Sequence, residues 1–284
     1  MLSYLHSFHA GNFADVLKHT VLVHTLQYLT QKPKPVFYLD THSGPGGFEL
    51  NSSEAQKNCE FENGIGRLWQ ETDLPDIVAD YVETVRQFQQ ACSNSSTTLR
   101  HYPGSPWFAC HLLREHDRLS LCELHPREQQ TLQANFKQER RIKVFNQDGF
   151  QTAIGAMPPK ERRGLVLIDP PYEVKTDYDR VVEVLKACHQ RFATGTYAIW
   201  YPVVQRQQIE KMLNAIQNSG IRNIQVFELG LEADTQQRGM TSSGMILVNP
   251  PWTLMAQMQS ALPYLAKKLG GKQGVYRIEQ LVDE

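Results

Sequence analysis

The stretch Leu165-Val166-Leu167-Ile168-Asp169-Pro170-Pro171-Tyr172 decides the interpretation of this chain. Its four apolar residues are typical of a buried strand. The residues that follow can all contact a planar amine. Asp169 can accept a hydrogen bond from an exocyclic N–H, and the Pro170 carbonyl can accept a second because the next proline keeps the backbone extended. The ring of Tyr172 offers a flat face on which a base can stack. The stretch therefore predicts a site that holds and orients a planar amine.

Apolar runs of the same kind recur along the chain, at residues 36–40, 119–123, 142–145, 197–201, 224–229 and 245–248. Segments with helical spacing separate most of them, for example residues 178–192 and 205–219. Continuous apolar strands that alternate with helices are typical of a largely parallel sheet that is covered on both faces. We therefore expect an α/β fold with a mostly parallel sheet of about seven strands.

One connection is too long for a single crossover helix. About 75 residues separate the start of the glycine-rich turn at residues 44–47 from the strand at 119–123, which is several times the usual length. Near its end, Ser105-Pro106 predicts a helix with serine as the N-cap. We therefore expect a small inserted helical subdomain at residues 50–102, and a core formed by residues 1–49 and 103–284 in which residues 1–35 are an N-terminal tail and helix.

The N-terminal helix has a recognisable start. Asn12 is a preferred N-cap residue, and Asp15 follows it by three positions. Four residues then repeat at helical spacing, so we expect one buried face on this helix: Leu17, Val21, His24 and Tyr28.

Charge and cysteine content limit the classes of function. The chain has 29 Lys and Arg against 30 Asp and Glu, so contact with nucleic acid must depend on a local basic face. The five cysteines contain no Cys-x-x-Cys pair. Neither they nor the N-terminal histidines have the spacing of a zinc site, which predicts reduced thiols and no metal. No apolar run is long enough to span a membrane and the N-terminus lacks the pattern of a secretion signal, so we expect a cytoplasmic protein.

Further strand ends carry residues suited to a nucleotide-like cofactor. The turn after the first strand contains Asp40, His42 and Gly44, and its glycines let a ligand approach the backbone closely. Glu123 ends the next core strand, where an acid can accept hydrogen bonds from two ribose hydroxyls. Asp148-Gly149 follows the third, where an acid could bind an adenine amine, although this pair is equally a plain turn signal. A dinucleotide site is a weaker interpretation, because the turn is not a clean G-x-G-x-x-G.

A second motif competes with the first. Asn249-Pro250-Pro251-Trp252 also follows an apolar strand and also combines an amide or acid, two prolines and an aromatic residue. In doubly wound sheets the ligand lies at the carboxyl ends of the strands beside the switch point, and the last strand is predicted to lie away from it. We therefore favour Asp169 over Asn249 as the residue that binds the amine.

Several segments resemble the RlmJ family of bacterial 23S ribosomal RNA adenine-N6 methyltransferases. The resemblance runs from Met1 to about residue 265 and is carried by these segments: Ser3-Tyr4-Leu5-His6-Ser7-Phe8-His9-Ala10-Gly11-Asn12, Asp15-Val16-Leu17-Lys18-His19, Tyr38-Leu39-Asp40-Thr41-His42, Tyr102-Pro103-Gly104-Ser105-Pro106 and Asp169-Pro170-Pro171-Tyr172-Glu173. It implies a Rossmann-like core that uses S-adenosylmethionine, releases S-adenosylhomocysteine and acts as a monomer.

The resemblance also implies roles for individual residues. It places catalysis at Asp169, with Pro170 and Tyr172 beside it, and it directs Tyr4, His6 and Lys18 toward the RNA. With the glycine-rich turn and Asp169 included, the expected cofactor contacts are His19, His42, Gly44, Ser105, Glu123, Asp148, Gly149 and Asp169.

The expected reaction is transfer of a methyl group from S-adenosylmethionine to the N6 amine of an adenine in 23S ribosomal RNA. Three alternatives remain open at this point. One is the same reaction on DNA, although no separate basic recognition domain is visible. The others are a protein-glutamine methyltransferase, which would use Asn249, and an RNA-binding protein that keeps the fold without catalysis.

Overall fold

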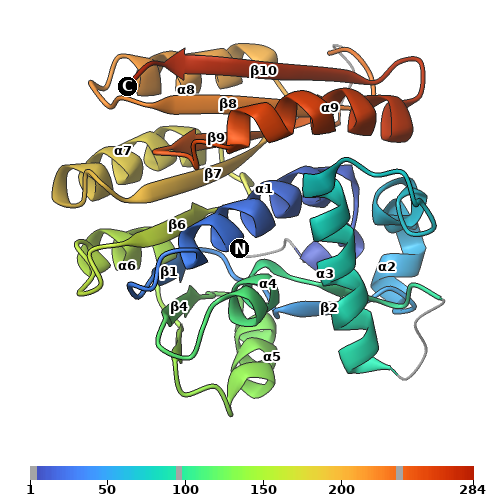
Figure 1. The fold of residues 1–284 in the computed structure, drawn as a ribbon, viewed down its shortest axis with the longest axis horizontal. Coiled ribbons are helices and arrows are strands. Elements are labelled where there is room, and N and C mark those ends of the chain that lie inside the picture. The colour runs from blue at the N-terminus through green and yellow to red at the C-terminus, as the bar shows by residue number, and fades with distance from the viewer. Residues whose placement is uncertain (1–4, 94–97, 235–238) are drawn as a thin grey trace.

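The computed structural model describes residues 5–93, 98–234 and 239–284, which form an α/β fold (Figure 1). In these ranges one eight-stranded sheet has the order β10-β8-β9-β7-β6-β1-β4-β5. Its strands are β1 (Phe37–Asp40), β4 (Arg118–Cys122), β5 (Ile142–Phe145), β6 (Gly164–Ile168), β7 (Thr196–Val203), β8 (Ile224–Gly230), β9 (Ser242–Val248) and β10 (Val275–Val282). The prediction of a mostly parallel α/β sheet is confirmed. β10 was not predicted, because this edge strand is only half-buried and lacks a continuous apolar run.

Strand direction determines which loops meet. β5, β4, β1, β6 and β7 are parallel neighbours, so their carboxyl ends share one edge of the sheet. β9 lies between β7 and β8 and is antiparallel to both. Its last residue, Val248, pairs with Tyr197 near the start of β7, so the carboxyl end of β9 lies at the opposite edge.

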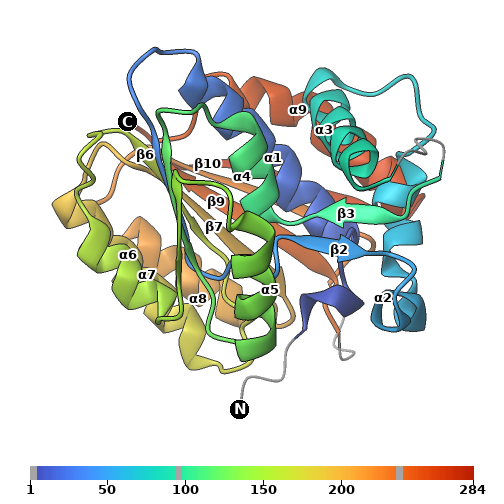
Figure 2. The ribbon, with the colours of Figure 1, turned by 90° about the horizontal axis from the view of Figure 1, so that it is seen from below.

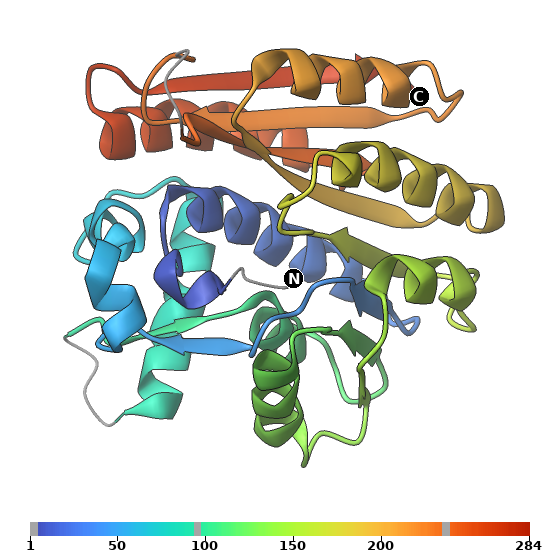
Figure 3. The same cartoon turned by 180° about the vertical axis from the view of Figure 1, so that it is seen from behind.

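Helices cover both faces of the sheet (Figures 2 and 3). One layer contains α6 (Gly149–Ala156), α7 (Thr176–Arg191) and α8 (Arg206–Gln217), and the other contains α1 (Phe13–Thr30), α4 (Ser105–Leu112), α5 (Pro126–Phe136) and α9 (Leu254–Gly270). In the described ranges no helix has the length and apolar character needed to cross a membrane.

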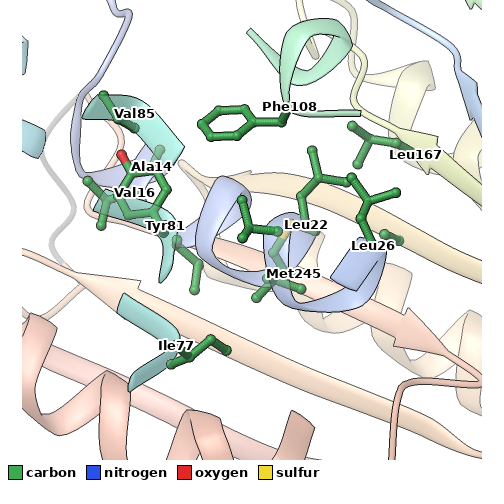
Figure 4. Close-up of a cluster of buried hydrophobic side chains, with 14 of the residues drawn as sticks. Ala14, Val16, Leu22, Leu26, Ile77, Tyr81, Val85, Phe108, Leu167 and Met245 are labelled. Atoms are coloured by element: carbon green, nitrogen blue, oxygen red, sulfur yellow. The ribbon is translucent and has the colours of Figure 1, made fainter. Parts of the chain in front are cut away.

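α1 is buried on almost every side, whereas the sequence predicted a single buried face. It begins as expected, because the Asn12 side chain accepts hydrogen bonds from the N–H groups of Ala14 and Asp15. Beyond that point the helix lies against the sheet on one side and against α3 (Asp76–Cys92), α4 and α9 on the others. Figure 4 shows Tyr81 of α3 near Ala14 and Val16 of α1, and Met245 of β9 near Leu22 of the same helix, all within one apolar cluster that also contains Phe108 of α4. A spacing rule for one apolar face cannot anticipate partners that come from so many distant segments.

The segment predicted as an insertion begins and ends beside a short antiparallel ribbon of β2 (Gly47–Glu49) and β3 (His101–Pro103). Between them lie α2 (Ser53–Asn58), the 3-10 helices η2 (Glu60–Asn63) and η3 (Ile65–Arg67), and α3. The buried side chains of α3 belong to the same apolar cluster as those of α1. The ribbon therefore brings the two ends of this segment together, and the buried side chains of the segment pack within the core of the protein.

Candidate functional site

A cavity of about 650 Å³ opens at the carboxyl ends of the parallel strands. Its walls come from the loops after β1, β4, β5, β6 and β7, from α1 and from the 3-10 helix η1 (His6–Phe8). This volume is in the range of pockets that bind cofactors and drug-sized ligands. Of the residues expected to act in catalysis, cofactor contact or RNA contact, all those in the described ranges line this cavity except Gly149, which lies between Asp148 and Phe150 of its wall; Asp40 of the glycine-rich turn does not line it.

Asp169 follows β6 and is held by residues from two distant segments. Its carboxylate accepts a hydrogen bond from Lys18 Nζ at 2.7 Å, and its backbone N–H lies 3.4 Å from Thr41 Oγ1. Lys18 also contacts Asp15 at 3.0 Å, so one buried ammonium group lies between two carboxylates. Burial would lower the pKa of Lys18, but the charges of Asp15 and Asp169 outweigh it and raise that pKa. Burial raises the pKa of Asp169, an effect that Lys18 opposes.

Tyr172 contributes an aromatic wall beside Asp169. Its hydroxyl donates to the Trp200 carbonyl at 2.7 Å, and its ring lies 4.4 Å from that of Tyr178. The backbone of Tyr172 has φ +51°, a left-handed conformation that is costly for an aromatic residue. Strain of this kind is often retained at functional sites, where it fixes the direction of a side chain.

The glycine-rich turn lies against the end of β4. Gly44 has φ +60° and donates its N–H to Glu123 Oε2 at 2.8 Å, while Glu123 Oε1 accepts from the His125 N–H at 2.7 Å. Each carboxylate oxygen has two lone pairs, so Glu123 can still accept from ligand hydroxyls. The structure therefore brings the turn and the acid together as predicted and links them directly.

Ser105 serves a different purpose from the predicted helix cap. The N-cap of α4 is Gly104, and the Ser105 hydroxyl donates to Asp40 Oδ2 at 2.6 Å. Asp40 also accepts from the Tyr38 hydroxyl and from the His42 N–H. Burial raises the pKa of Asp40 to about 6. The prediction of Ser105 as an N-cap is wrong, because α4 begins one residue earlier than expected: Ser105 is its first helical residue, and the hydroxyl is directed to Asp40.

The loop after β5 is held by Asp148. One carboxylate oxygen caps α6 by accepting from the N–H groups of Phe150 and Gln151, and the other accepts from Arg180 at 2.9 Å. A side chain at Gly149 would meet the Thr41 carbonyl at 1.9 Å, so only glycine fits there. Nearby, the ring of His42 packs edge-on against Phe150, and burial lowers the pKa of His42 to about 4. His42 is therefore a neutral group in this wall.

His19 lies behind Lys18 and is almost fully buried. Its Nδ1 is 2.7 Å from the Tyr102 hydroxyl, and its Nε2 has no hydrogen-bond partner among the described residues. A buried polar atom without a partner calls for an explanation, and a ligand in the cavity that this residue lines would provide one.

Of the three residues expected to face the RNA, the structure describes His6 and Lys18. His6 Nε2 lies 2.8 Å from Asp15, so His6 and Lys18 are held by the same carboxylate. Tyr4 lies outside the described residues. Asp15 was interpreted from the sequence only as a residue of the helix start, and nothing in its local pattern indicated that it joins Lys18 to the cavity.

Asn249 lies at the opposite edge of the sheet. Its side-chain amide donates to the carbonyls of Ala193 and Gly195, both at 2.8 Å, and it does not line the cavity. Trp252 of the same motif is 79% exposed. This second motif is therefore a turn that the Asn249 side chain holds in place by hydrogen bonds to two backbone carbonyls.

The cavity fits S-adenosylmethionine on its own chemistry. Glu123 can hold a ribose, Asp148 lines the same cavity where it can meet an adenine amine, and His19, whose buried Nε2 has no partner among the described residues, lines the cavity together with the glycine-rich turn. In the described ranges no group of three or more His, Cys, Asp or Glu side chains could hold a metal ion.

Comparison with known proteins agrees with this geometry. A family model described as "Ribosomal RNA large subunit methyltransferase D, RlmJ" matches residues 33–282. The chain is 53% identical over 269 residues to ribosomal RNA large subunit methyltransferase J of Haemophilus influenzae and 51% identical over 269 residues to the protein of that name from Escherichia coli. Each alignment covers 95% of this chain and 94% of the relative.

A solved structure is also similar over nearly its whole length. A crystal structure of a Legionella pneumophila protein, from a family of unknown function, has a TM-score of 0.88 and 37% identity, and the match covers 96% of this chain and 98% of that one. The chain belongs to the RlmJ family of ribosomal RNA large subunit methyltransferases.

Proposed function

We propose that this protein transfers a methyl group from S-adenosylmethionine to the N6 amine of an adenine in 23S ribosomal RNA. The observation that carries the proposal is the position of Asp169 and Tyr172 in one cavity with the glycine-rich turn. The names of its relatives, which are large-subunit ribosomal RNA methyltransferases, support this class of substrate.

The residues of the site act mainly by orientation. The amine of adenine is a poor nucleophile, because its lone pair is conjugated with the ring. Hydrogen bonds to Asp169 and to the Pro170 carbonyl favour a pyramidal nitrogen, and stacking on Tyr172 fixes the plane of the base. When bound, S-adenosylmethionine supplies an electrophilic methyl group. The amine nitrogen would gain the methyl group as the bond between that carbon and the sulfonium sulfur breaks, which releases S-adenosylhomocysteine, and one proton of the amine would pass to Asp169 or to water.

Lys18 pairs with one oxygen of Asp169, Oδ2, which leaves the other oxygen able to accept a hydrogen bond from the amine. Its second partner, Asp15, lies 3.0 Å away and keeps the ammonium group paired if Asp169 turns toward the base. A carboxylate held ready in this way needs little reorganisation, which is the main source of electrostatic catalysis.

We also propose that residues 50–102 form an inserted helical subdomain that faces the RNA, and that the protein acts as a monomer in the cytoplasm. The position of α2 beside η1 supports the first part: Lys57 lies 5.6 Å from the ring of Phe8, and His9 contacts Glu60 at 2.9 Å. Replacing the exposed Lys57 with Glu should weaken RNA binding without changing the affinity for cofactor, and sedimentation should give the mass of a single chain.

The deciding experiment is methyl transfer from labelled S-adenosylmethionine to unmodified 23S RNA, followed by nucleoside analysis. The wild type should produce N6-methyladenosine, and Asp169→Ala should not. Label on DNA or on protein glutamine would establish one of the alternative substrates. Binding of RNA without any binding of the cofactor would establish a non-catalytic protein. Offering naked RNA and a precursor particle in parallel would identify the natural form of the substrate.

A further inference from the structure

His19 forms part of the cavity wall with only one of its two ring nitrogens paired. The ring is 1% exposed and lies 4.6 Å from that of Phe108 and 5.6 Å from that of Tyr102. Burial lowers the pKa of His19 well below its ordinary value, so the imidazole is neutral. A neutral imidazole has one N–H and one bare nitrogen, and either arrangement is possible for an isolated ring. Which nitrogen holds the proton depends on what the paired nitrogen contacts.

The paired nitrogen, Nδ1, ends a series of hydrogen bonds that runs through two tyrosine hydroxyls. Tyr102 Oη lies 2.7 Å from His19 Nδ1, and Tyr81 Oη lies 2.9 Å from Tyr102 Oη. Both tyrosines are fully buried, and burial raises the pKa of each well above its ordinary value, so both hydroxyls keep their protons. The described part of the chain gives the Tyr81 hydroxyl no partner other than Tyr102.

The number of available protons distinguishes the two directions in which this series of hydrogen bonds could run. If Tyr81 donates to Tyr102 and Tyr102 donates to His19 Nδ1, each hydroxyl proton is used, and the imidazole proton is on Nε2. In the reverse direction His19 Nδ1 would donate to Tyr102 and Tyr102 to Tyr81. The Tyr81 proton would then be buried without an acceptor, which is costly.

We propose that Tyr81 and Tyr102 are positioning residues that fix His19 with its proton on Nε2, and that this N–H donates a hydrogen bond to the carboxylate of the methionine part of the cofactor. The other tautomer would present a bare nitrogen to the cavity and would suit the ammonium group instead. The inference rests on the proposed function, because it takes S-adenosylmethionine as the ligand. Tyr81 lies on α3 and Tyr102 on β3, so the segment between β2 and β3 contributes to cofactor binding from within the core.

The first test is nitrogen NMR of the free protein with labelled histidine. The two tautomers give opposite patterns of protonated and bare ring nitrogens. His19 should show a protonated Nε2 and a bare, hydrogen-bonded Nδ1, and His19→Gln assigns the signal. A protonated Nδ1 would overturn the proposal, whatever the catalytic activity of the protein.

The second test compares two ligands by calorimetry. S-Adenosylhomocysteine has both the carboxylate and the ammonium group, whereas S-adenosyl-3-thiopropylamine keeps the ammonium group and lacks the carboxylate. Tyr102→Phe should reduce the fraction of His19 that carries its proton on Nε2, and the affinity for S-adenosylhomocysteine should fall roughly ten-fold. Tyr81→Phe should have a smaller effect on the same affinity. Neither substitution should change the affinity for the amine. Equal weakening of both ligands, or of neither, would overturn the proposal.

Tyr197→Phe is the matched control. It also removes a buried hydroxyl, one that donates to the Phe192 carbonyl at 2.7 Å in the apolar cluster on the other face of the sheet. Tyr197→Phe should leave the affinities for both ligands unchanged. If it lowered the affinity for S-adenosylhomocysteine as much as Tyr102→Phe does, the effect would come from general packing and the proposal would be wrong. If the wild type bound S-adenosylhomocysteine but did not methylate RNA, only the proposed substrate would fail. If it did not bind S-adenosylhomocysteine, the proposed cofactor and this inference would fail together.

Discussion

The ends of β6 and β9 have nearly the same local sequence and entirely different surroundings. Asp169-Pro170-Pro171-Tyr172 lies in the cavity, where Lys18 pairs with its carboxylate and Tyr172 forms a wall. Asn249-Pro250-Pro251-Trp252 lies at the opposite edge of the sheet, where Asn249 is tied to two backbone carbonyls and Trp252 extends into solvent. The difference follows from strand direction, since β6 is parallel to β1 and β9 is antiparallel to β7. A motif of this kind acquires a function only where the topology brings it to the cofactor.

The largest effect should separate the two motifs directly. Asp169→Ala removes the acceptor that orients the amine and should lower the methylation rate about a thousand-fold, the size of effect seen when a preorganised polar group is lost. Single-turnover assays with 23S RNA would measure it. Asn249→Ala should leave the rate unchanged.

Asn249→Ala should instead lower the free energy of unfolding by about 1–2 kcal/mol, because it removes two hydrogen bonds and puts alanine at φ +50°. Urea titration would measure this loss. A large loss of methylation by Asn249→Ala, with Asp169→Ala still active, would reverse the assignment and favour a protein-glutamine substrate.

A second difference is the buried charge at the end of β6. Lys18→Met keeps most of the apolar stem but leaves Asp15 and Asp169 without their shared cation. Removing one member of a buried ionic group leaves uncompensated charge, so the free energy of unfolding should fall by about 3 kcal/mol. Denaturation would measure this, with Lys211→Met as the control, since Lys211 forms an exposed ion pair with Asp179. Equal losses in the two variants would show that the buried group is unimportant for stability.

The contrast between the motifs also marks what sequence can and cannot predict. The strand before Asp169, the turn at Gly44 and the acid at Glu123 were predictable, because each is a local pattern at the end of an apolar run. The contact between Lys18 and Asp169 joins residues 151 positions apart, and no local pattern indicates it. For the same reason the burial of α1 on several sides was missed, and so was the pairing of Ser105 with Asp40 in place of a helix cap.

A smaller effect concerns pH, because a carboxylate titrates and the Asn249 amide does not. The pKa of Asp40 is about 6 in the folded protein and 3.8 ordinarily, so the folded state binds this proton more tightly. The resulting stabilisation is fully present below the ordinary pKa and is lost as the pH rises through about 6. Between about pH 4 and pH 7 the wild type should lose about 2 kcal/mol relative to Asp40→Asn. Urea unfolding at several pH values would measure it, and the deficit of Asn249→Ala should stay constant over the same range. A constant difference between wild type and Asp40→Asn would mean that Asp40 is ionised throughout.

The last comparison is between the two aromatic residues that end the motifs. Tyr172→Ala removes the face on which the adenine is proposed to stack, and base stacking on an aromatic side chain contributes about 1–3 kcal/mol. The value of kcat/KM for RNA should therefore fall roughly ten-fold or more, while the affinity for S-adenosylhomocysteine stays within about two-fold. Tyr172→Phe keeps the ring but loses the hydrogen bond to the Trp200 carbonyl, so it should retain most of the activity. Trp252 is 79% exposed at the other edge of the sheet, and Trp252→Ala should change neither activity nor stability measurably. If Trp252→Ala weakened RNA binding as much as Tyr172→Ala, the RNA would have to reach both edges of the sheet, and the second motif would be part of the substrate-binding surface after all.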